Sequence, residues 1–286
     1  MPTVFRQGAT AVITGGASGI GLALAKRCAA LGMRVLVADK DPGLLAAIPE
    51  GVAAVSVQMD VANPEDWVKI KEKVDSDFGG KLSLLALNAG IGQKSSWSSP
   101  SEFHTTMSVN YFGVLHGITT LLPLIKSSGN PTEPSAIVIR GSKQGITNPP
   151  GNPAYNASKA AVKSLAEHLS FDLRSSAPSV SVHLLVPGWT WTGLAGGKPG
   201  EGRDTEGAAE LKASGAWWPE QVVEYLEKMM AEGQFWVLCP DEEVTEEMDR
   251  KRMLWGANDA VEGRPPLSRW REEYKGQVAE WMAQVM

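Results

Sequence analysis

Residues 10–21 read Thr-Ala-Val-Ile-Thr-Gly-Gly-Ala-Ser-Gly-Ile-Gly, and this segment indicates the architecture of the whole chain. Its first residues predict the end of a short buried strand, and the apolar run over residues 22–31 predicts a helix. A glycine-rich turn between a strand and a helix is the setting in which proteins bind the phosphates of a dinucleotide. We expect Gly15 to permit a tight turn, Gly19 to let the backbone approach a pyrophosphate, and Gly21 to let the helix pack close to the strand.

An acidic residue follows the next predicted strand, which spans residues 34–38. This residue, Asp39, lies about 20 positions after the glycine turn, where a carboxylate can accept hydrogen bonds from the adenosine ribose. The carboxylate would also repel a 2′-phosphate, and Ser18 in the turn carries no positive charge to attract one. The positive charge of Lys40 could partly offset the negative charge of Asp39. These residues favour NAD over NADP, and the alternative is that Asp39 is a loop acid with no role in binding.

Tyr155 and Lys159 are four residues apart in a run with helical spacing. Four residues is about one helical turn, so the phenol and the ammonium project from the same face. A cation beside a phenol stabilises the deprotonated form, and such a tyrosine can exchange protons near neutral pH. The spacing alone is common, and the alternative is a solvated pair on a helix surface.

With these features, the chain resembles the short-chain dehydrogenase/reductase family in its compact single-domain form. The resemblance runs from Thr14 to Thr192, and the family's glycine motif Thr-Gly-x-x-x-Gly-x-Gly is complete in residues 14–21. Two positions depart from the family pattern: Leu87 replaces the first asparagine of an Asn-Asn-Ala-Gly motif, and Thr190 replaces an aliphatic residue. The other matches are Asp60 with Val61 after the third strand, Asn88 and Gly90 after the fourth, Asn110 in a helix, Ser142 after the fifth strand, and Pro187, Gly188 and Thr192 after the sixth.

The resemblance implies an oxidoreductase that transfers a hydride between NAD(H) and a secondary alcohol or ketone. Tyr155 would be the general acid in reduction and the general base in oxidation, and Lys159 would support it and hold the nicotinamide ribose. Ser142 would hydrogen-bond the substrate oxygen, and Asn110 would hold a water that relays protons. The family's cofactor contacts correspond to Gly15, Ser18, Gly19, Ile20, Asp39, Asp60, Val61, Asn88, Gly90, Tyr155, Lys159, Pro187, Gly188, Thr190 and Thr192.

Predicted strands alternate with predicted helices along the chain, which favours an α/β fold with a doubly wound parallel sheet of the Rossmann type and about seven strands. We expect a single domain over residues 1–286. Residues 193–232 interrupt the alternation as a substrate loop followed by a helix over 219–231, and the seventh strand would span 235–238. Residues 241–286 form a C-terminal extension, with a helix predicted over 245–255, that would pack on the domain or on a neighbouring subunit.

Composition and charge narrow the possible partners. The hydrophobic fraction of 43% suffices for a sizeable core, and a net charge of −5 with a pI near 5.5 argues against a nucleic-acid surface. No apolar run approaches the roughly 18 residues of a membrane span, the first residues lack a signal-peptide pattern, and the four histidines show no metal-ligand spacing. These observations, together with two cysteines in predicted core elements, predict a cytoplasmic protein that binds neither a metal nor a membrane. The family resemblance also implies that the protein forms a homodimer or homotetramer and acts on a small-molecule alcohol or carbonyl compound.

The tryptophans give the main indication of the substrate. Ten are present. Trp97 follows the fourth predicted strand, Trp189 and Trp191 follow Pro187-Gly188, and residues 217–218 lie by the substrate loop, all where a substrate would bind. Aromatic side chains around a cleft suit a bulky or aromatic alcohol or ketone, and the alternative is that they fix loops against the core. Lys143, beside the predicted catalytic serine, could meet an anionic substrate or be an ordinary solvated lysine.

Two other classes of function stay open at this level. A protein of the same fold could bind NAD as a scaffold or sensor without catalysis, although the complete set of four catalytic residues argues against this. An epimerase or dehydratase could also use nicotinamide with a tyrosine–lysine pair, although those relatives usually have another glycine spacing and a larger C-terminal domain.

Overall fold

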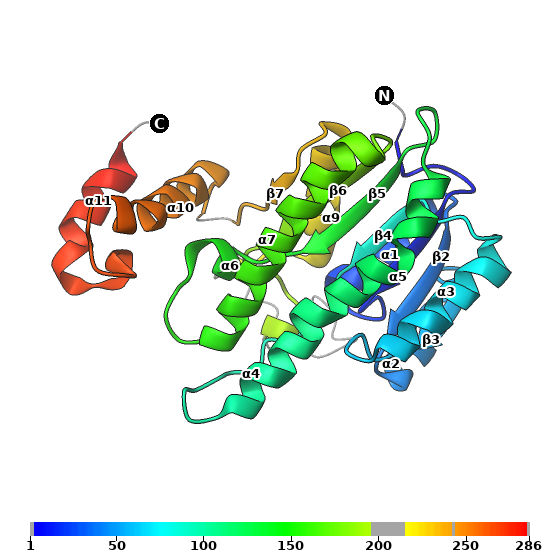
Figure 1. The fold of residues 1–286 in the computed structure, drawn as a ribbon, viewed down its shortest axis with the longest axis horizontal. Helices are drawn as coiled ribbons and strands as arrows, with labels where there is room; N and C mark the ends of the chain where they lie inside the picture. Colours follow the sequence, from blue (N-terminus) through cyan, green and yellow to red (C-terminus); the bar gives the residue numbers. More distant parts are fainter. Residues whose placement is uncertain (1–2, 196–214, 242–243, 285–286) are drawn as a thin grey trace.

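A computed structural model describes residues 3–195, 215–241 and 244–284. Its centre is a parallel sheet of seven strands with helices on both faces (Figure 1). The strands are β1 (Thr10–Thr14), β2 (Arg34–Asp39), β3 (Val55–Gln58), β4 (Leu84–Leu87), β5 (Ser135–Arg140), β6 (Val180–Val186) and β7 (Trp236–Leu238).

The strand order in the sheet is β3-β2-β1-β4-β5-β6-β7, and every neighbouring pair is parallel. Val12 of β1 pairs with Leu36 of β2 on one side and with Leu85 of β4 on the other. The direction in which the chain adds strands reverses between β1 and β4. A crevice for ligands is expected at that point, outside the carboxyl ends of the strands. The prediction of a doubly wound parallel sheet with seven strands is confirmed.

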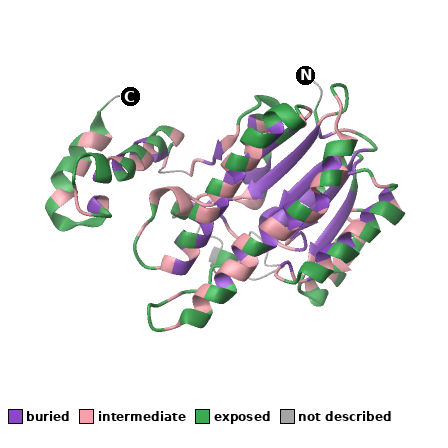
Figure 2. Cartoon of the chain, viewed as in Figure 1, coloured by how far each residue is buried: buried purple, intermediate pink, exposed green. Residues whose placement is uncertain are grey.

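The sheet is buried because helices cover both faces. Figure 2 shows the central strands as the main buried layer, with exposed residues on the outer sides of the helices. One face packs against α3, α5 and α7 through a core that includes Trp67 and Leu121, and the other packs against α1 and α9 through residues such as Leu24 and Leu226. The helices that the structure describes in this part are α1 (Gly19–Ala30), α2 (Pro42–Ala46), α3 (Pro64–Phe78), α4 (Pro100–Met107), η1 (Ser108–Phe112), α5 (Gly113–Ser128), α6 (Lys143–Thr147), α7 (Pro153–Ser176), η2 (Gly193–Ala195) and α9 (Pro219–Ala231).

Short local signals set the ends of several helices. Proline at the first helical position begins α3, α4, α7 and α9, where its missing N–H costs nothing because that group has no helical partner. The Asn63 side chain accepts a hydrogen bond from Glu65 N at 3.2 Å and caps the start of α3, and Gly79 ends that helix with φ at 62°. The predicted helix over residues 219–231 is α9.

The C-terminal extension lies beside one end of the sheet (Figure 1). It contains α10 (Glu246–Val261), two 3-10 turns η3 (Ser268–Trp270) and η4 (Glu272–Tyr274), and α11 (Lys275–Ala283). The sequence predicted a helix over residues 245–255, and α10 runs six residues further, to Val261. In the structure, α10 contacts α6 of the domain. Most of the predicted substrate loop, residues 196–214, lies outside the described residues, and the single-domain boundary stays a prediction.

One helical stretch bears on the expectation that no segment could span a membrane. Among the described residues, Pro100–Ser128 is long and apolar enough for a membrane span by length and composition alone, so that expectation was wrong on this point. Val114, Ile118 and Leu121 of this stretch are nonetheless buried in the core against the sheet. A helix that covers a parallel sheet needs such an apolar face, which accounts for its composition.

Candidate active site

The glycine turn lies between β1 and α1, and its close contacts exclude larger side chains. A Cβ at Gly21 would collide with the carbonyl oxygen of Gly15 and would lie 2.6 Å from Asn88 Nδ2. That Nδ2 donates to the Gly15 carbonyl oxygen at 3.1 Å. A Cβ at Gly19, where φ is +50°, would lie 2.9 Å from Thr192 Cγ2. The structure therefore brings the turn, the end of β4 and the loop after β6 together.

The start of α1 has the properties of a phosphate site. Ser18 precedes the helix in an extended conformation and makes no side-chain cap hydrogen bond, and no acidic residue lies in the first turn. The first N–H groups of a helix have no partner within the helix, and they carry the positive end of its dipole. Ile20, in the first turn of α1, is buried in the core. These residues fit the pyrophosphate of a dinucleotide.

Asp39, at the end of β2, is built into the turn. Its Oδ2 accepts a hydrogen bond from Ala17 N at 3.1 Å, so the carboxylate lies beside the predicted ribose site. Lys40, which could have offset this charge, instead pairs with Asp60 at 2.7 Å. Burial tends to raise the pKa of Asp60, but hydrogen bonds from Lys40 and from the backbone outweigh burial and hold the pKa below its ordinary value. Val61, which follows Asp60, is buried.

Asn110 is buried in η1, a π-helical turn between α4 and α5. Its Oδ1 accepts from Ile91 N at 2.9 Å, and its Nδ2 donates to Ile91 O and to Ser158 Oγ, both at 3.0 Å. A Cβ at Gly90 would lie 3.1 Å from Asn110 Oδ1 and 3.5 Å from Lys159 Nζ. Turns of this π type recur at functional sites. Here the turn joins the segment after β4 to α7.

Tyr155 and Lys159 project from α7 toward the end of β5. The Lys159 ammonium lies 5.9 Å from the centroid of the Tyr155 ring, so the two groups share one face as the spacing predicts. Lys159 is 2% exposed, and its Nζ donates to the carbonyl oxygen of Arg140 at 2.8 Å. Burial and the positive charge of Arg140 lower the pKa of Lys159 to about 7.

Ser142 stands between β5 and α6. Its Oγ accepts a hydrogen bond from Gln144 N at 3.2 Å and thereby caps α6. A hydroxyl group that accepts in this way keeps its own hydrogen, which it can donate to a substrate oxygen.

The loop after β6 carries the remaining predicted cofactor contacts. The Pro187 carbonyl oxygen accepts from Lys143 N at 3.4 Å, so this loop touches the start of α6. Thr190 Oγ1 donates to the Gly188 carbonyl oxygen at 3.2 Å, and Thr192 Oγ1 donates to the Thr190 carbonyl oxygen at 3.4 Å. The loop thus runs from the turn at Ser142 and Lys143, called the serine turn below, to the glycine turn between β1 and α1.

The tryptophans divide between exposed and packed positions. Trp189 is 61% exposed and Trp97 is 84% exposed. Trp191 N donates to the Trp217 carbonyl oxygen, and Trp217 N donates to the Trp189 carbonyl oxygen, both at 2.9 Å. The rings of Trp191 and Trp218 meet edge to face at 6.4 Å. Trp191 and Trp217 therefore hold the loop after β6 to the segment before α9. The Trp97 ring lies 5.5 Å from that of Phe103 on α4, so of the two exposed tryptophans only Trp189 belongs to the loop after β6.

A buried ion cluster beside Ser142 was missed from the sequence. Lys143 Nζ lies 3.1 Å from Asp241 Oδ2 and 2.9 Å from Asp249 Oδ2, and the side chains of these two acids are 8% and 1% exposed. Lys143 is therefore not a solvated lysine. Both the ammonium of Lys143 and the carboxylate of Asp241 press against Gly188. The extension thus reaches the serine turn and the loop after β6 through one cluster of charges.

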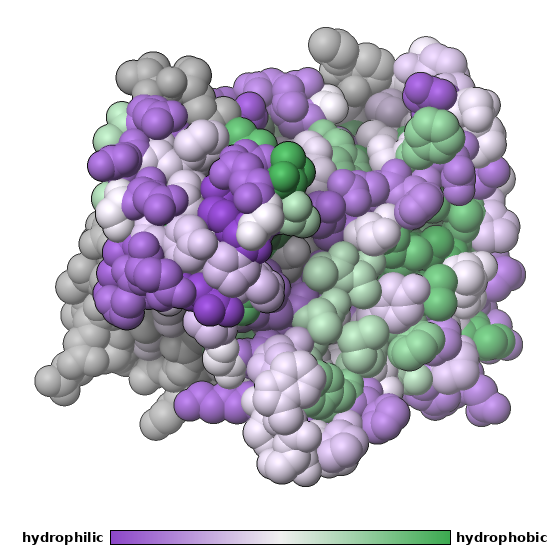
Figure 3. Space-filling model, turned by 60° about the vertical axis from the view of Figure 1, so that its left-hand side comes forward, coloured by the Kyte–Doolittle hydropathy of each residue, from purple (hydrophilic) through white to green (hydrophobic). Residues whose placement is uncertain are grey.

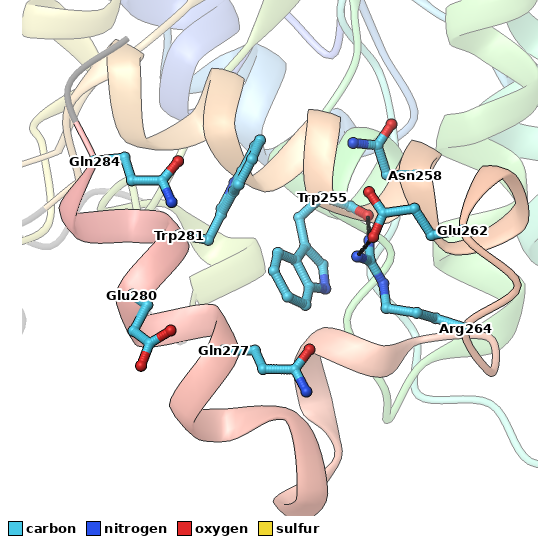
Figure 4. Close-up of a pocket in the computed structure, with 8 residues that line it drawn as sticks. All are labelled: Trp255, Asn258, Glu262, Arg264, Gln277, Glu280, Trp281 and Gln284. Carbon is cyan, nitrogen blue, oxygen red and sulfur yellow. Dashed lines mark hydrogen bonds and ion pairs between the residues drawn. The ribbon is translucent and has the colours of Figure 1, made fainter.

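The extension also contains a cavity of about 260 Å³ between α10 and α11 (Figure 4). Trp255 and Trp281 face it with their rings 6.0 Å apart, and Arg264 pairs with Glu262 at its edge. None of the residues that line it belongs to the predicted site. The chemistry described above therefore lies at the carboxyl ends of the strands and not in this cavity.

Comparison with known proteins gives the class to which this fold and site belong. Residues 9–200 match a family model described as short chain dehydrogenase. A 1-deoxy-11-beta-hydroxypentalenate dehydrogenase of Streptomyces avermitilis is 35% identical over 224 residues, which are 74% of this chain and 80% of the relative. An NADP-dependent (R)-specific alcohol dehydrogenase of Lentilactobacillus kefiri is 30% identical over 72% of this chain and 79% of the relative.

A solved structure agrees with these relatives. A short-chain dehydrogenase/reductase of Burkholderia phymatum in complex with NAD superposes with a TM-score of 0.77 and 31% identity, covering 91% of this chain and 96% of that chain. The chain belongs to the short-chain dehydrogenase/reductase family. It is accordingly an oxidoreductase by family, with a nucleotide-binding Rossmann fold.

Proposed function

We propose that the protein transfers a hydride between NAD(H) and a secondary alcohol or ketone. The observation that carries the proposal is the pairing of Tyr155 with Lys159 on one face of α7, at the sheet edge where the glycine turn also lies. Asn110 is tied to α7 through Ser158, and Ser142 caps the helix that packs against α7. Four groups of the types needed for proton transfer and oxygen binding therefore lie around the ends of β4 and β5.

Each of these residues has a defined task in the proposed reaction. In oxidation the Tyr155 oxygen takes the proton of the substrate hydroxyl, and in reduction it returns a proton to the carbonyl oxygen. The Ser142 hydroxyl donates a hydrogen bond to the same substrate oxygen. Lys159 holds a positive charge near Tyr155 while it is protonated. The bound nicotinamide supplies the hydride acceptor in oxidation and the hydride donor in reduction.

The cofactor is proposed to be NAD, with NADP disfavoured. Asp39 holds a negative charge beside the turn, and the neighbouring Lys40 pairs with Asp60 rather than with Asp39. A 2′-phosphate at the ribose would meet the charge of Asp39. The Burkholderia phymatum relative contains NAD, whereas the Lentilactobacillus kefiri relative is NADP-dependent, so membership of the family does not decide the preference.

The substrate is proposed to be bulky and apolar or aromatic. Trp189, next to the predicted cofactor loop, leaves an indole largely exposed where it can cover such a molecule. The Streptomyces avermitilis relative is named for a dehydrogenase of 1-deoxy-11-beta-hydroxypentalenate, and a relative in Pseudomonas putida for one of cis-2,3-dihydrobiphenyl-2,3-diol. Both names indicate ring alcohols of considerable size.

The protein is also proposed to be a cytoplasmic homodimer or homotetramer. Phe112, the last residue of η1, is 44% exposed, and Phe171 on α7 is 64% exposed. Figure 3 shows hydrophobic residues at the surface among polar ones, mainly on the right-hand half of the view. Exposed aromatic side chains are enriched at interfaces between subunits. Light scattering that gave the mass of a monomer would contradict this part of the proposal.

The reaction is tested with a panel of aromatic, alicyclic and aliphatic secondary alcohols in the presence of NAD. We expect NADH to form, as followed by its ultraviolet absorbance, in equal amount with a ketone identified by mass spectrometry, and we expect ring alcohols to react fastest. The Ser142→Ala variant should react more slowly because one donor to the substrate oxygen is lost. A protein that binds NADH but turns over no alcohol or ketone of the panel would instead be a catalytically silent member of the family.

A further inference from the structure

A groove of about 930 Å³ lies where the C-terminal extension meets the domain. Residues of α6 and α7 form one wall, and α10 with the segment that leads to η3 forms the other. None of the predicted catalytic or cofactor-binding residues lines this groove. A volume of this size suits a small molecule. The groove is therefore a second candidate site, separate from the carboxyl ends of the strands.

The groove combines apolar side chains with positive charge. Leu254, Leu267 and Trp270 line it and are exposed, so three large apolar groups lie uncovered along one hollow. Among the described residues that line it, five are cations and one is an acid: Lys163, Arg250, Arg252, Arg264 and Arg269 against Asp259. A ligand that carries a negative charge on an apolar body would match both features.

Arg269 is the cation of the groove that lacks a carboxylate partner. The other four are paired, as Lys163–Glu167, Arg250–Glu246, Arg252–Asp249 and Arg264–Asp259. Arg269 makes no ion pair within the part of the chain that the structure describes, and its Nη1 is buried without a hydrogen-bond partner. Its guanidinium carbon lies 4.4 Å from the centroid of the Trp270 ring. Stacking on an aromatic ring holds a guanidinium in place and leaves its N–H groups free to bind an anion.

Positive charges outnumber negative charges around Arg269. Lys143 is shared by Asp241 and Asp249, and Asp249 Oδ1 also lies 3.4 Å from Arg252 Nη1. With Arg269, three cations therefore meet two carboxylates. Burial and the positive charge of Arg252 lower the pKa of Arg269 to about 10, while Asp249 acts in the opposite direction, so Arg269 is still protonated at neutral pH. A buried cation without its own anion is unfavourable, and one further negative charge would balance the group.

We propose that this groove binds an amphipathic carboxylate of the fatty-acid type, whose carboxylate pairs with Arg269 and whose apolar chain lies on Leu254, Leu267 and Trp270. A single unpaired cation calls for a single negative charge, and the planar guanidinium matches the geometry of a carboxylate. The site goes beyond the proposed hydride transfer and does not depend on it. Two explanations compete with this proposal: a second copy of the chain covers the groove, or Arg269 serves only the packing of the extension.

The test compares two probes that differ only in the charge of the head group. Octanoate and the neutral octanamide are titrated into the full-length protein by calorimetry, without nicotinamide or alcohol. We expect the wild type to bind octanoate about tenfold or more tightly than octanamide, because hydrogen bonds to an ionised group are the stronger ones. Arg269→Met should bind the two probes with similar affinity, and its affinity for octanamide should stay within a few-fold of the wild type. Arg269→Lys should restore part of the preference for octanoate.

Arg271→Met is the matched control. Arg271 is an exposed arginine two positions further along the chain, it does not line the groove, and its Nη1 lies 3.7 Å from Glu273. This variant should keep the full preference for octanoate. If Arg269→Met does not fold, as judged by circular dichroism, Arg269→Lys is compared with Arg269→Gln, and equal preferences there would overturn the proposal.

Three further results would overturn it. The first is a wild type that does not bind octanoate, or a preference for octanoate that persists in folded Arg269→Met. The second is loss of octanoate binding in Trp189→Ala, which would place the ligand at the predicted substrate site. The third is a wild-type dimer that becomes a monomer in Leu254→Glu by light scattering, which would assign the groove to a subunit interface. A protein that binds octanoate through Arg269 but oxidises no alcohol would contradict the proposed function and leave this inference standing.

Discussion

The carboxylate of Asp39 has two roles that can be separated by one substitution. It accepts a hydrogen bond from Ala17 N, and it places a negative charge beside the predicted ribose. In Asp39→Asn the amide oxygen can still accept from Ala17 N, while the bond that Asp39 Oδ1 accepts from Asp41 N at 3.2 Å is lost together with the charge. We expect the ratio of kcat/KM with NADP to kcat/KM with NAD to rise about tenfold or more, since a like-charge contact costs several kcal/mol.

The control for this prediction is Asp41→Asn. Asp41 accepts hydrogen bonds from Gly43 N at 2.8 Å and Leu44 N at 3.2 Å and caps α2, so it is a neighbouring acid with a local role. An asparagine can cap in the same way. The cofactor ratio should stay unchanged in Asp41→Asn, and an unchanged ratio in Asp39→Asn as well would show that the charge of Asp39 does not select the cofactor.

Lys159 should make the stability of the cofactor-free protein depend on pH. Its pKa in the folded protein is about 7, below the ordinary 10.5. Between these values the unfolded chain holds a proton that the folded protein has lost, so this group makes stability rise with pH. Below about pH 7 both states are protonated, and the unfavourable contribution is fully present. The urea midpoint of the wild type should therefore increase between about pH 7 and about pH 9 more than that of Lys159→Met. The same increase in both proteins would contradict the lowered pKa.

At the scale of helices and strands, the contact between α10 and α6 depends on Lys143. In Lys143→Met the buried carboxylates of Asp241 and Asp249 lose their shared cation. Removing one partner of a buried ion pair typically costs about 3–5 kcal/mol of unfolding free energy. We expect a loss in this range by urea denaturation, with a lower kcat because the preceding residue, Ser142, loses its support.

Lys71→Met is the control for this element. Lys71 and Asp75 form an exposed pair within α3 at 2.6 Å, and such pairs contribute below about 1 kcal/mol. Asp249→Asn should by itself reduce stability, and the double variant Lys143→Met/Asp249→Asn should lose less than the sum of the two single losses. Equal losses for Lys71→Met and Lys143→Met would show that the cluster does not hold the extension in place.

The elements show which sequence signals can be read directly. The proline and the spacing of apolar residues were enough to predict α9 with its observed ends, because both signals act within the helix itself. Lys143 was misread because Asp241 lies 98 positions further along the chain, and only the packing of the extension brings the two together. The end of α10 was also placed too early. No proline follows until Pro265, and the tertiary contacts of Trp255 continue the helix.

For the molecule as a whole, the motifs were sufficient to predict the sheet. The strands of a parallel sheet are buried on both faces, and the crossovers between them are right-handed. Once the glycine turn is placed at the end of β1, these two rules leave few alternative topologies for the sheet. The motifs after β1, β2, β4, β5 and β6 then fall on one edge of that sheet, and this follows from topology alone. A charged residue at the end of Ser-Ala-Ile-Val-Ile-Arg is a visible signal that Arg140 differs from the rest of its strand. That its guanidinium donates to the Asn88 carbonyl oxygen at the end of β4 depends on side-chain packing that no sequence pattern reports.

The central claim is that the Tyr155 hydroxyl moves the proton in a nicotinamide-dependent oxidation, and one substitution tests it most directly. Tyr155→Phe removes the hydroxyl and keeps the ring. With the fastest alcohol of the panel and saturating NAD, the initial rate of NADH formation should fall by about 10²–10⁴-fold, while the affinity for NADH, measured by fluorescence, stays within a few-fold of the wild type. Full-speed NADH formation by Tyr155→Phe would contradict the account.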